Sequence, residues 1–289
     1  TAIGTNAQAN RADQLVLGSD STETTIANLS GTGSSLILAN SDGTLSRSTL
    51  STYTLNSIGY MNMATSSASI GSAYASGSNS LATGYNAIAN GAGATAYGSA
   101  ANATGDNALA LGFNAVVSNK TGAIAVGAGA NASGDYSQAI GSNSSANAFA
   151  ATASGADATA SGYRTTALGA VAMASGSASS AVGSYSTVTG NLSTALGAYT
   201  AASGNQSTAL GYSANAAGSG STATGFKAKA SNTYSTASGA YANASGNYSL
   251  ASGYQANASG NSSQALGYRA NASGIYSQAL GPQATASGY

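Results

Sequence analysis

The 289-residue sequence predicts an all-β fold, a parallel β-roll whose short strands stack one coil upon the next. Three observations support this prediction: glycine recurs with a period of 14, as at positions 197, 211, 225 and 239; each repeat divides into two similar halves of seven; and most apolar residues are alanine. Seven residues fit a strand of four or five residues plus a tight turn, and they are too few for half of a helical hairpin. The fixed period is typical of a solenoid with two strands per coil. Roughly 16 coils would make a stack about 75 Å long.

Two interleaved glycine series set the phase of the coils. The first runs through residues 84–281, and the second lies halfway between its members, through residues 162–288. Asn232 takes the place of a glycine in the second series. Because asparagine tolerates positive φ better than most side chains, we interpret this slot as a left-handed turn position.

One coil is irregular. The step from Gly112 to Gly127 exceeds the regular period by one position, and the polar sequence NKT lies within it at 119–121. We expect the additional residue to loop out at a turn, because an additional residue in a strand would move every later side chain to the wrong face.

Alternation along each strand separates an inner from an outer face. In the first strand of a coil, Ser207 and Ala209 share one face, and Thr208 and Leu210 share the other. The second strand, within 214–217, repeats the small pair but carries asparagine on its other face. We place the small pairs inside the roll, between two closely spaced sheets. The alternative is that the larger residues fill the roll and alanine faces outward.

The outer face of the first strand then carries what we call the apolar stripe. A continuous apolar surface of this length is rare on a monomer, so the stripe predicts a surface shared between chains. At residues 152–154, 222–224 and 236–238 the same face carries only Thr and Ser, and there we expect the shared surface to be polar. The stripe consists of Ile70, Leu111, Val126, Ile140, Leu168, Val182, Leu196, Leu210, Leu266 and Leu280.

Catalysis and cofactor binding are not expected. The chain has no His and no Cys, which removes the usual zinc ligands and the His-activated nucleophiles. Asp106, Asp135 and Asp157 lie on different coils and do not form the paired carboxylates of glycoside hydrolysis. We therefore predict a protein that is not an enzyme and that holds no metal or cofactor.

The charge balance also limits the class of partner. Seven basic and seven acidic residues cancel, so the net charge indicates no nucleic-acid partner. No apolar run approaches the ~18 residues of a membrane span, so we expect no membrane contact by this part of the protein.

Aromatic residues recur one or two positions after the turn glycines. Stacked coils would align them as ladders at the turns, where they either cover sheet edges and grooves between subunits or contact a partner. The residues predicted for partner contact are Tyr212, Tyr254, Tyr268 and Lys229.

Short motifs in this grid resemble the NSVAIG-type repeat of the YadA-like head domains of trimeric autotransporter adhesins. They are NALALG at 107–112, GAIAVG at 122–127 and STALG at 207–211. The resemblance implies a homotrimer of left-handed parallel β-rolls on a stalk, with the apolar stripe as the trimer interface. It also implies a bacterial cell-surface location, with an outer-membrane anchor in a C-terminal region that is absent from this sequence.

The resemblance and the glycine grid divide the chain into three parts. Residues 1–21 form β-roll coils, 22–66 form a β insertion without the repeat, and 67–289 form the β-roll head of about 16 coils. Within the insertion, Asp42-Gly43 is a hairpin turn signal. Because the sequence begins with Thr1, we expect it to be a piece of a longer protein.

The function expected from these features is adhesion. A trimeric head would attach to host matrix proteins, cells or abiotic surfaces through many repeated contacts. One alternative is a trimeric phage or fibre-type spike with a structural role. A less favoured alternative is an ice-binding solenoid, which would need a regular threonine lattice where this chain mixes residue types.

Overall fold

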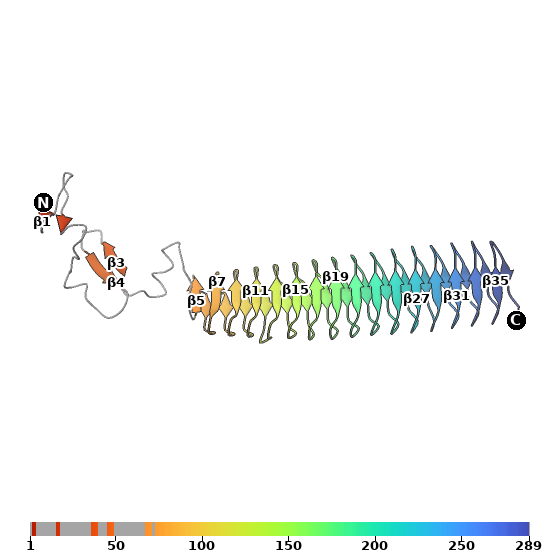
Figure 1. The fold of residues 1–289 in the computed structure, drawn as a ribbon, viewed down its shortest axis with the longest axis horizontal. Coiled ribbons are helices and arrows are strands. Elements are labelled where there is room, and N and C mark those ends of the chain that lie inside the picture. Colours follow the sequence, from red (N-terminus) through yellow and green to blue (C-terminus); the bar gives the residue numbers. More distant parts are fainter. Residues whose placement is uncertain are drawn as a thin grey trace. The chain divides into compact units, whose positions relative to one another are not determined.

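The computed structural model describes residues 73–288 without a gap and five short segments before them, at 2–3, 16–17, 36–39, 45–48 and 67–70. The chain forms two compact units, Thr1–Met61 and Asn62–Tyr289. All regular elements in the described residues are β-strands (Figure 1). Within these residues there is accordingly no helix that could cross a membrane.

The first unit contains two pairs of short strands. β1 (Ala2–Ile3) and β2 (Val16–Leu17) pair in parallel, and the register between them equals one period of the repeat. β3 (Leu36–Ala39) and β4 (Leu45–Ser48) pair antiparallel. The expected turn residues Asp42-Gly43 fall between β3 and β4 but lie outside the described residues.

The second unit is a parallel β-roll made of two sheets with 16 strands each. Odd-numbered strands from β5 to β35 form one sheet and even-numbered strands from β6 to β36 form the other, so each coil contributes one strand to each sheet (Figure 1). This arrangement confirms the predicted all-β roll with two short strands per coil.

The odd-strand sheet consists of β5 (Ser67–Ile70), β7 (Ser80–Thr83), β9 (Thr95–Tyr97), β11 (Leu109–Leu111), β13 (Ile124–Val126), β15 (Gln138–Ile140), β17 (Thr152–Ser154), β19 (Thr166–Leu168), β21 (Ser180–Val182), β23 (Thr194–Leu196), β25 (Thr208–Leu210), β27 (Thr222–Thr224), β29 (Thr236–Ser238), β31 (Leu250–Ser252), β33 (Gln264–Leu266) and β35 (Gln278–Leu280). The even-strand sheet consists of β6 (Tyr74–Ala75), β8 (Ile88–Ala89), β10 (Asn102–Ala103), β12 (Val116–Val117), β14 (Asn131–Ala132), β16 (Ser145–Ala146), β18 (Thr159–Ala160), β20 (Met173–Ala174), β22 (Thr187–Val188), β24 (Ala201–Ala202), β26 (Asn215–Ala216), β28 (Lys229–Ala230), β30 (Asn243–Ala244), β32 (Asn257–Ala258), β34 (Asn271–Ala272) and β36 (Thr285–Ala286).

The irregular coil keeps the phase of the stack, as predicted. Leu109 pairs with Ile124, one position beyond the regular period, and Ile124 pairs with Gln138 at the regular period. Val117 ends β12 and Ile124 begins β13, so the additional residue lies in the turn at 118–123. Every later strand therefore keeps its inner and outer faces.

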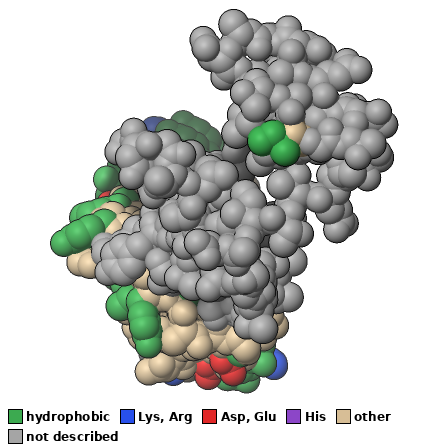
Figure 2. All heavy atoms as spheres, turned by 90° about the vertical axis from the view of Figure 1, so that its left-hand side faces the viewer, with side chains coloured by type: hydrophobic (Ala, Val, Ile, Leu, Met, Phe, Trp, Pro, Cys, Tyr) green, Lys and Arg blue, Asp and Glu red, His purple; other side chains and the backbone are tan. Residues whose placement is uncertain are grey.

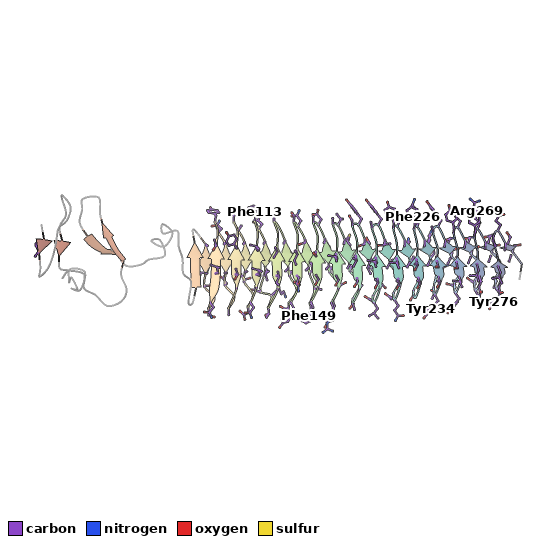
Figure 3. All side chains as sticks on the ribbon, turned by 45° about the horizontal axis from the view of Figure 1, so that its top comes forward. Phe113, Phe149, Phe226, Tyr234, Arg269 and Tyr276 are labelled. Carbon is purple, nitrogen blue, oxygen red and sulfur yellow. The ribbon has the colours of Figure 1, made fainter. Side chains whose placement is uncertain are left out.

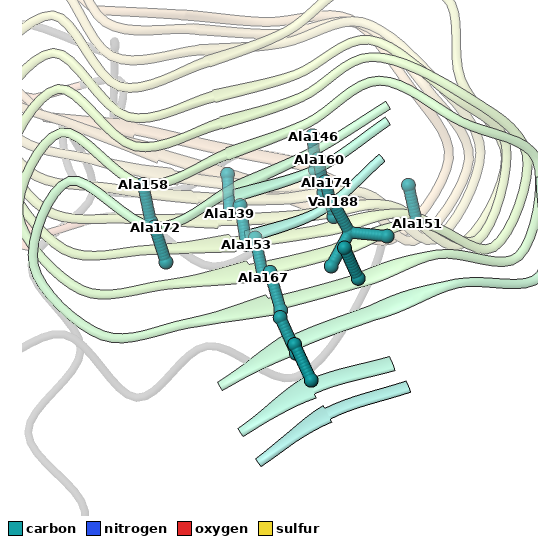
Figure 4. Close-up of a cluster of buried hydrophobic side chains, with 14 of the residues drawn as sticks. Ala139, Ala146, Ala151, Ala153, Ala158, Ala160, Ala167, Ala172, Ala174 and Val188 are labelled. Atoms are coloured by element: carbon teal, nitrogen blue, oxygen red, sulfur yellow. The ribbon is translucent and has the colours of Figure 1, made fainter. Parts of the chain in front are cut away.

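The core of the roll is a narrow double row of small side chains. The buried apolar residues are alanines, except for Val117 and Val188, and buried Ser and Thr complete the rows (Figure 4). At β25 the alternation of buried and exposed side chains is clear. Ser207, just before the strand, and Ala209 are buried, whereas Leu210 is exposed. The small pairs therefore lie inside, and the alternative in which the larger residues fill the roll is wrong.

Several buried hydroxyls close turns from within the core, whereas those of Ser207, Ser221 and Ser263 have no hydrogen-bond partner. Thr200 Oγ1 donates to the carbonyl oxygen of Gly197 at 2.6 Å, and Ser249 Oγ donates to that of Gly246 at 2.6 Å. A buried hydroxyl needs a partner, and a buried turn carbonyl does too. Each of these bonds satisfies both groups without adding volume to the core.

Left-handed residues occur in both turns of a coil, two positions after the glycine of each series. Ser213 has a φ of 54° and Tyr248 a φ of 55°, and many other side chains adopt the same conformation. The first glycine series also has positive φ, for example 121° at Gly211, but Asn232 and the glycines that share its series do not. The left-handed interpretation of the Asn232 slot was therefore wrong.

Close approach between coils explains the second glycine series. A Cβ built on Gly204 would lie 2.0 Å from the carbonyl oxygen of Gly218, and one on Gly218 would lie 2.0 Å from the carbonyl oxygen of Asn232. Asn232 itself donates a side-chain hydrogen bond to the carbonyl oxygen of Ser245 in the next coil. Most of these slots hold glycine because the backbone of the next coil leaves little room for a side chain, and Asn232 fits with its amide bonded to that backbone.

We predict that Gly204→Ala lowers the free energy of unfolding by about 3 kcal/mol, because neighbouring coils must separate to admit the methyl group. Urea denaturation followed by circular dichroism measures the effect. The control is Ser203→Ala at the exposed neighbouring position, which should change stability by less than about 0.5 kcal/mol. Equal effects of the two substitutions would refute the close-approach explanation.

A second prediction concerns the irregular coil. Deletion of Lys120 shortens its turn to the regular length, so the unfolding midpoint should change little. Deletion of Thr208, inside β25, removes a residue from a strand and should abolish the cooperative transition, since it shifts every later face. If both deletions destabilise the roll alike, the additional residue is not a looped-out one.

Candidate functional site

The roll offers four long surfaces: the outer faces of its two sheets and its two edges. We call the row of turns that follow odd-numbered strands edge A, and the row that follow even-numbered strands edge B. Figure 3 shows Phe113, Phe226 and Arg269 along edge A and Phe149, Tyr234 and Tyr276 along edge B. Each surface repeats once per coil, so side chains at equivalent positions form lines along the stack.

The outer face of the odd-strand sheet carries the apolar stripe. The register joins its members in sequence, for example Leu168 to Val182 to Leu196. Leu168, Leu196 and Leu210 are 46%, 45% and 41% exposed in the single chain. Seen along the axis of the coils, hydrophobic side chains stand out from the outline of the roll (Figure 2).

The remaining stripe residues lie on the same face. Leu111, Ile140 and Leu280 are exposed, whereas Val126, Val182 and Leu266 are half-buried. Ile70 pairs with Thr83 at the stripe position, but its side chain lies outside the described residues. Tyr97 pairs with Leu111 and extends the line. The Leu/Ile/Val pattern that defines the predicted stripe does not include this aromatic residue.

The stripe has a polar interval of three successive coils. Leu210 pairs with Thr224, and Ser238 and Ser252 continue the line before Leu266 resumes it. This interval contains the polar levels expected at 222–224 and 236–238, and Ser154 interrupts the stripe at the third expected level. In the coil of Ser252, Leu250 keeps an apolar side chain on the same face.

The outer face of the even-strand sheet is polar from Asn215 to Asn271, whereas Ile88, Val116 and Met173 lie on it earlier in the stack. Asn243 Nδ2 donates to Asn257 Oδ1 at 2.7 Å, and Asn257 Nδ2 donates to Asn271 Oδ1 at 2.8 Å. Lys229 pairs with Asn243 on this face and is exposed. The line of amides is thus internally bonded, while the lysine ammonium faces solvent.

Edge A carries a continuous line of seven aromatic rings, which we call the aromatic ladder. Successive ring centroids are 5.0–6.0 Å apart, and each ring is 41–52% exposed. The ladder brings three predicted contact residues together with four that were not predicted. Its members are Tyr185, Tyr199, Tyr212, Phe226, Tyr241, Tyr254 and Tyr268.

The position of each aromatic residue after its glycine sets the ring geometry. Tyr212 and Phe226 both come one residue after a glycine, and their rings stack at an interplanar angle of 11°. Phe226 and Tyr241 come one and two residues after, and their rings meet edge to face at 69°. The other ring pairs of both edges follow this rule when the count starts at Ala148 for Phe149 and at Asn232 for Tyr234, where these residues take the place of the glycine. Such pairs contribute roughly 0.5–1.5 kcal/mol each, so the ladder also stabilises the stack.

Two cations lie against the ladder. Lys227 Nζ is 5.3 Å from the ring centroid of Phe226 and 5.8 Å from that of Tyr241. Arg269 Cζ is 5.1 Å from the ring centroid of Tyr268, and Arg269 Nε donates to Gln255 Oε1 at 2.8 Å. The rings and the glutamine hold both side chains along the edge, in cation–π geometry.

The three acids of the roll have different surroundings. Asp106 Oδ1 accepts a hydrogen bond from the backbone nitrogen of Ala92 at 2.9 Å, and Asp135 Oδ1 accepts one from that of Thr121 at 3.0 Å. These two carboxylates therefore cap turns of the preceding coil at edge B, whereas Asp157 lies at a left-handed position of edge A. Among the described residues, no group of three acidic, His or Cys side chains could hold a metal ion.

Comparisons with known proteins identify the family. The model of the YadA head domain repeat matches overlapping copies over residues 71–115, 118–144, 146–172, 174–200 and 202–289. The chain therefore belongs to the family of YadA head domain repeats, as the sequence motifs indicated. This is a family of adhesin head domains and not an enzyme family.

One similar solved structure is the collagen-binding domain of the Yersinia adhesin YadA. It is 23% identical, and the alignment covers 55% of this chain and 69% of that chain with a TM-score of 0.30. No curated protein matches the chain.

Proposed function

We propose that this chain is the head of a homotrimeric adhesin on a bacterial surface. The observation that supports it most is the apolar stripe on the outside of a roll whose repeats belong to an adhesin-head family. In this proposal an outer-membrane anchor holds the protein at the bacterial surface. Its partners are host matrix proteins, cells or abiotic surfaces.

The stripe has the chemistry of a trimer interface. The roll itself covers about half of each stripe leucine. Complete burial in the interface would therefore contribute about 1 kcal/mol per leucine to the free energy of trimer formation. Repeated over ten coils and three chains, this contribution is large enough to hold the subunits together. The polar interval from Thr224 to Ser252 would place hydroxyl groups from all three chains in the same layers.

Adhesion through repetition fits the surface better than a single pocket does. The even-strand face and both edges present similar side chains in successive coils, so each contact with a partner can be weak. Three linked copies raise the effective concentration for every contact after the first. The mixture of Asn, Lys, Met and Thr on the even-strand face lacks the regular threonine lattice of an ice-binding surface.

The stripe can be tested with matched substitutions in one coil. Leu168 is 46% exposed on the odd-strand face, and Met173 is 49% exposed on the even-strand face. Leu168→Asp should reduce the trimer fraction strongly, because it buries three carboxylates in one layer. Met173→Asp should leave it unchanged.

Light scattering measures the molar mass of the parent and of both variants. The parent should have three times the chain mass of 27.4 kDa. A folded parent monomer, or equal loss of trimer in the two variants, would show that the stripe is not the interface.

The distributed nature of adhesion gives a second test. Deletion of residues 240–267 removes two whole coils, so the phase is kept and adhesion should fall only gradually. Leu168→Asp, which disfavours the trimer, should reduce adhesion steeply because effective concentration is lost.

Binding to matrix-coated surfaces at equal concentration of folded protein measures both effects. Adhesion that survives in the monomer but is abolished by one tyrosine substitution would point to a discrete pocket and refute the proposal.

A further inference from the structure

The charges of this neutral chain are separated along its length. Residues 1–157 hold seven acids and three bases, giving −4, whereas residues 158–289 hold four bases and no acid, giving +4. Asp157 is the last acidic residue of the sequence. The C-terminal coils are therefore uniformly cationic, although the net charge is zero.

Three of these four bases lie at or beside edge A. Lys227 and Arg269 are turn residues held against the aromatic ladder, and Lys229 begins the strand that leaves this edge. The fourth, Arg164, lies over Tyr163 at edge B. The ladder and the cationic charge thus occupy the same edge and the same coils.

Half of the ladder's ring pairs are stacked, which leaves no open ring face between their members. Tyr185 and Tyr199 are parallel within 2° at 5.0 Å, and Tyr254 and Tyr268 within 10° at 5.6 Å. A flat ligand cannot enter between rings at these distances. The hydroxyls form a line of hydrogen-bond donors and acceptors, which suits a partner rich in hydroxyl groups.

We propose that edge A, from Tyr185 to Arg269, binds a linear polysaccharide with one uronate carboxylate per disaccharide. The phenol hydroxyls bond its sugar hydroxyls, and Lys227, Lys229 and Arg269 bind its carboxylates through charge-assisted hydrogen bonds. This inference rests on the adhesin function proposed above and names the ligand class and the part of the roll that binds it.

The spacing of the charges favours this ligand over nucleic acid. Lys227 and Arg269 are three coils apart, which corresponds to about 14 Å along the stack. Duplex DNA carries one charge per ~1.7 Å, and single strands rely on open ring faces for base stacking. Edge A has sparse cations, and half of its ring pairs are stacked, so it matches a polymer with widely spaced carboxylates better than a nucleic acid.

The test is binding of the trimeric protein to surface-attached hyaluronan, at moderate and at raised ionic strength. Lys227→Gln, Lys229→Gln and Arg269→Gln together remove the charges at and beside edge A. This triple variant should weaken binding about tenfold and lose most of the salt dependence. Arg164→Gln is the matched control at edge B and should change binding by less than about twofold.

Two matched double variants test the rings of the aromatic ladder. Tyr199 and Tyr241 are left-handed residues of edge A, and Tyr234 and Tyr248 are left-handed residues of edge B. Asparagine suits all four positions. Tyr199→Asn with Tyr241→Asn should weaken binding about threefold, and Tyr234→Asn with Tyr248→Asn should not.

The outcomes separate this inference from the adhesin function. Equal binding of single-stranded DNA or neutral dextran, equal effects at the two edges, or loss of the trimer in the edge A variants would overturn it. Absent hyaluronan binding with intact attachment to a matrix-coated surface would also overturn it while leaving the adhesin function standing. Failure on both surfaces would count against the adhesin function itself.

Discussion

The close spacing of successive coils is the constraint on which the rest of this structure depends. A parallel sheet fixes the distance between neighbouring strands at about 4.8 Å, and here the turns keep that distance as well as the strands do. At Gly204 the carbonyl oxygen of the next coil lies where a Cβ would be. The same compactness inside the roll restricts the core to Ala, Ser and Thr, with valine at only two fully buried positions.

An alanine core leaves the larger apolar residues no place inside, and this explains the surface. In the strands of the roll, the described leucine and isoleucine side chains point outward, as does every valine except Val117 and Val188, and most aromatic rings project from the turns. Each outward residue then lies against its equivalent in the next coil, as Leu196 lies against Leu210 and Tyr185 against Tyr199. Repetition therefore converts single exposed side chains into continuous lines, and these lines are the surfaces available for assembly and for adhesion.

The backbone accepts a conformational cost to make such short coils. Many non-glycine residues have φ between 50° and 59°, including seven tyrosines. The left-handed conformation costs roughly 1–2 kcal/mol for a residue with a side chain. Ring contacts such as Tyr234 with Tyr248, at 5.5 Å, offset part of that cost by packing one left-handed side chain on the next. The aromatic residues at the turns thus combine a structural role with the binding role that we propose for edge A.

The sequence by itself determined the period, the sheet arrangement and the phase, because glycine spacing and alternation follow directly from strand geometry. It also determined that the additional residue between Gly112 and Gly127 loops out at a turn. An additional residue within a strand would reverse the inner and outer faces of every later strand. The inward position of Ala209 and the outward position of Leu210 were inferred as the better of two possibilities. Only the packed core excluded the other, because the largest side chains that the described residues bury between the sheets are valine and threonine.

Tertiary structure alone decided the role of the second glycine series and the composition of edge A. The reason that Gly218 must be glycine is the carbonyl oxygen of Asn232, which the sequence places one full coil away and the fold places within 2.0 Å. The sequence also shows an aromatic residue after many glycines, but the edge on which each lies depends on which turn its glycine begins. Tyr241 and Tyr248 are half a coil apart and lie on opposite edges, whereas Tyr241 and Tyr254 are neighbours. The roll brings residues into contact at a step of about one coil and separates those at half a coil, and that geometry gathered the rings and cations of edge A into one surface.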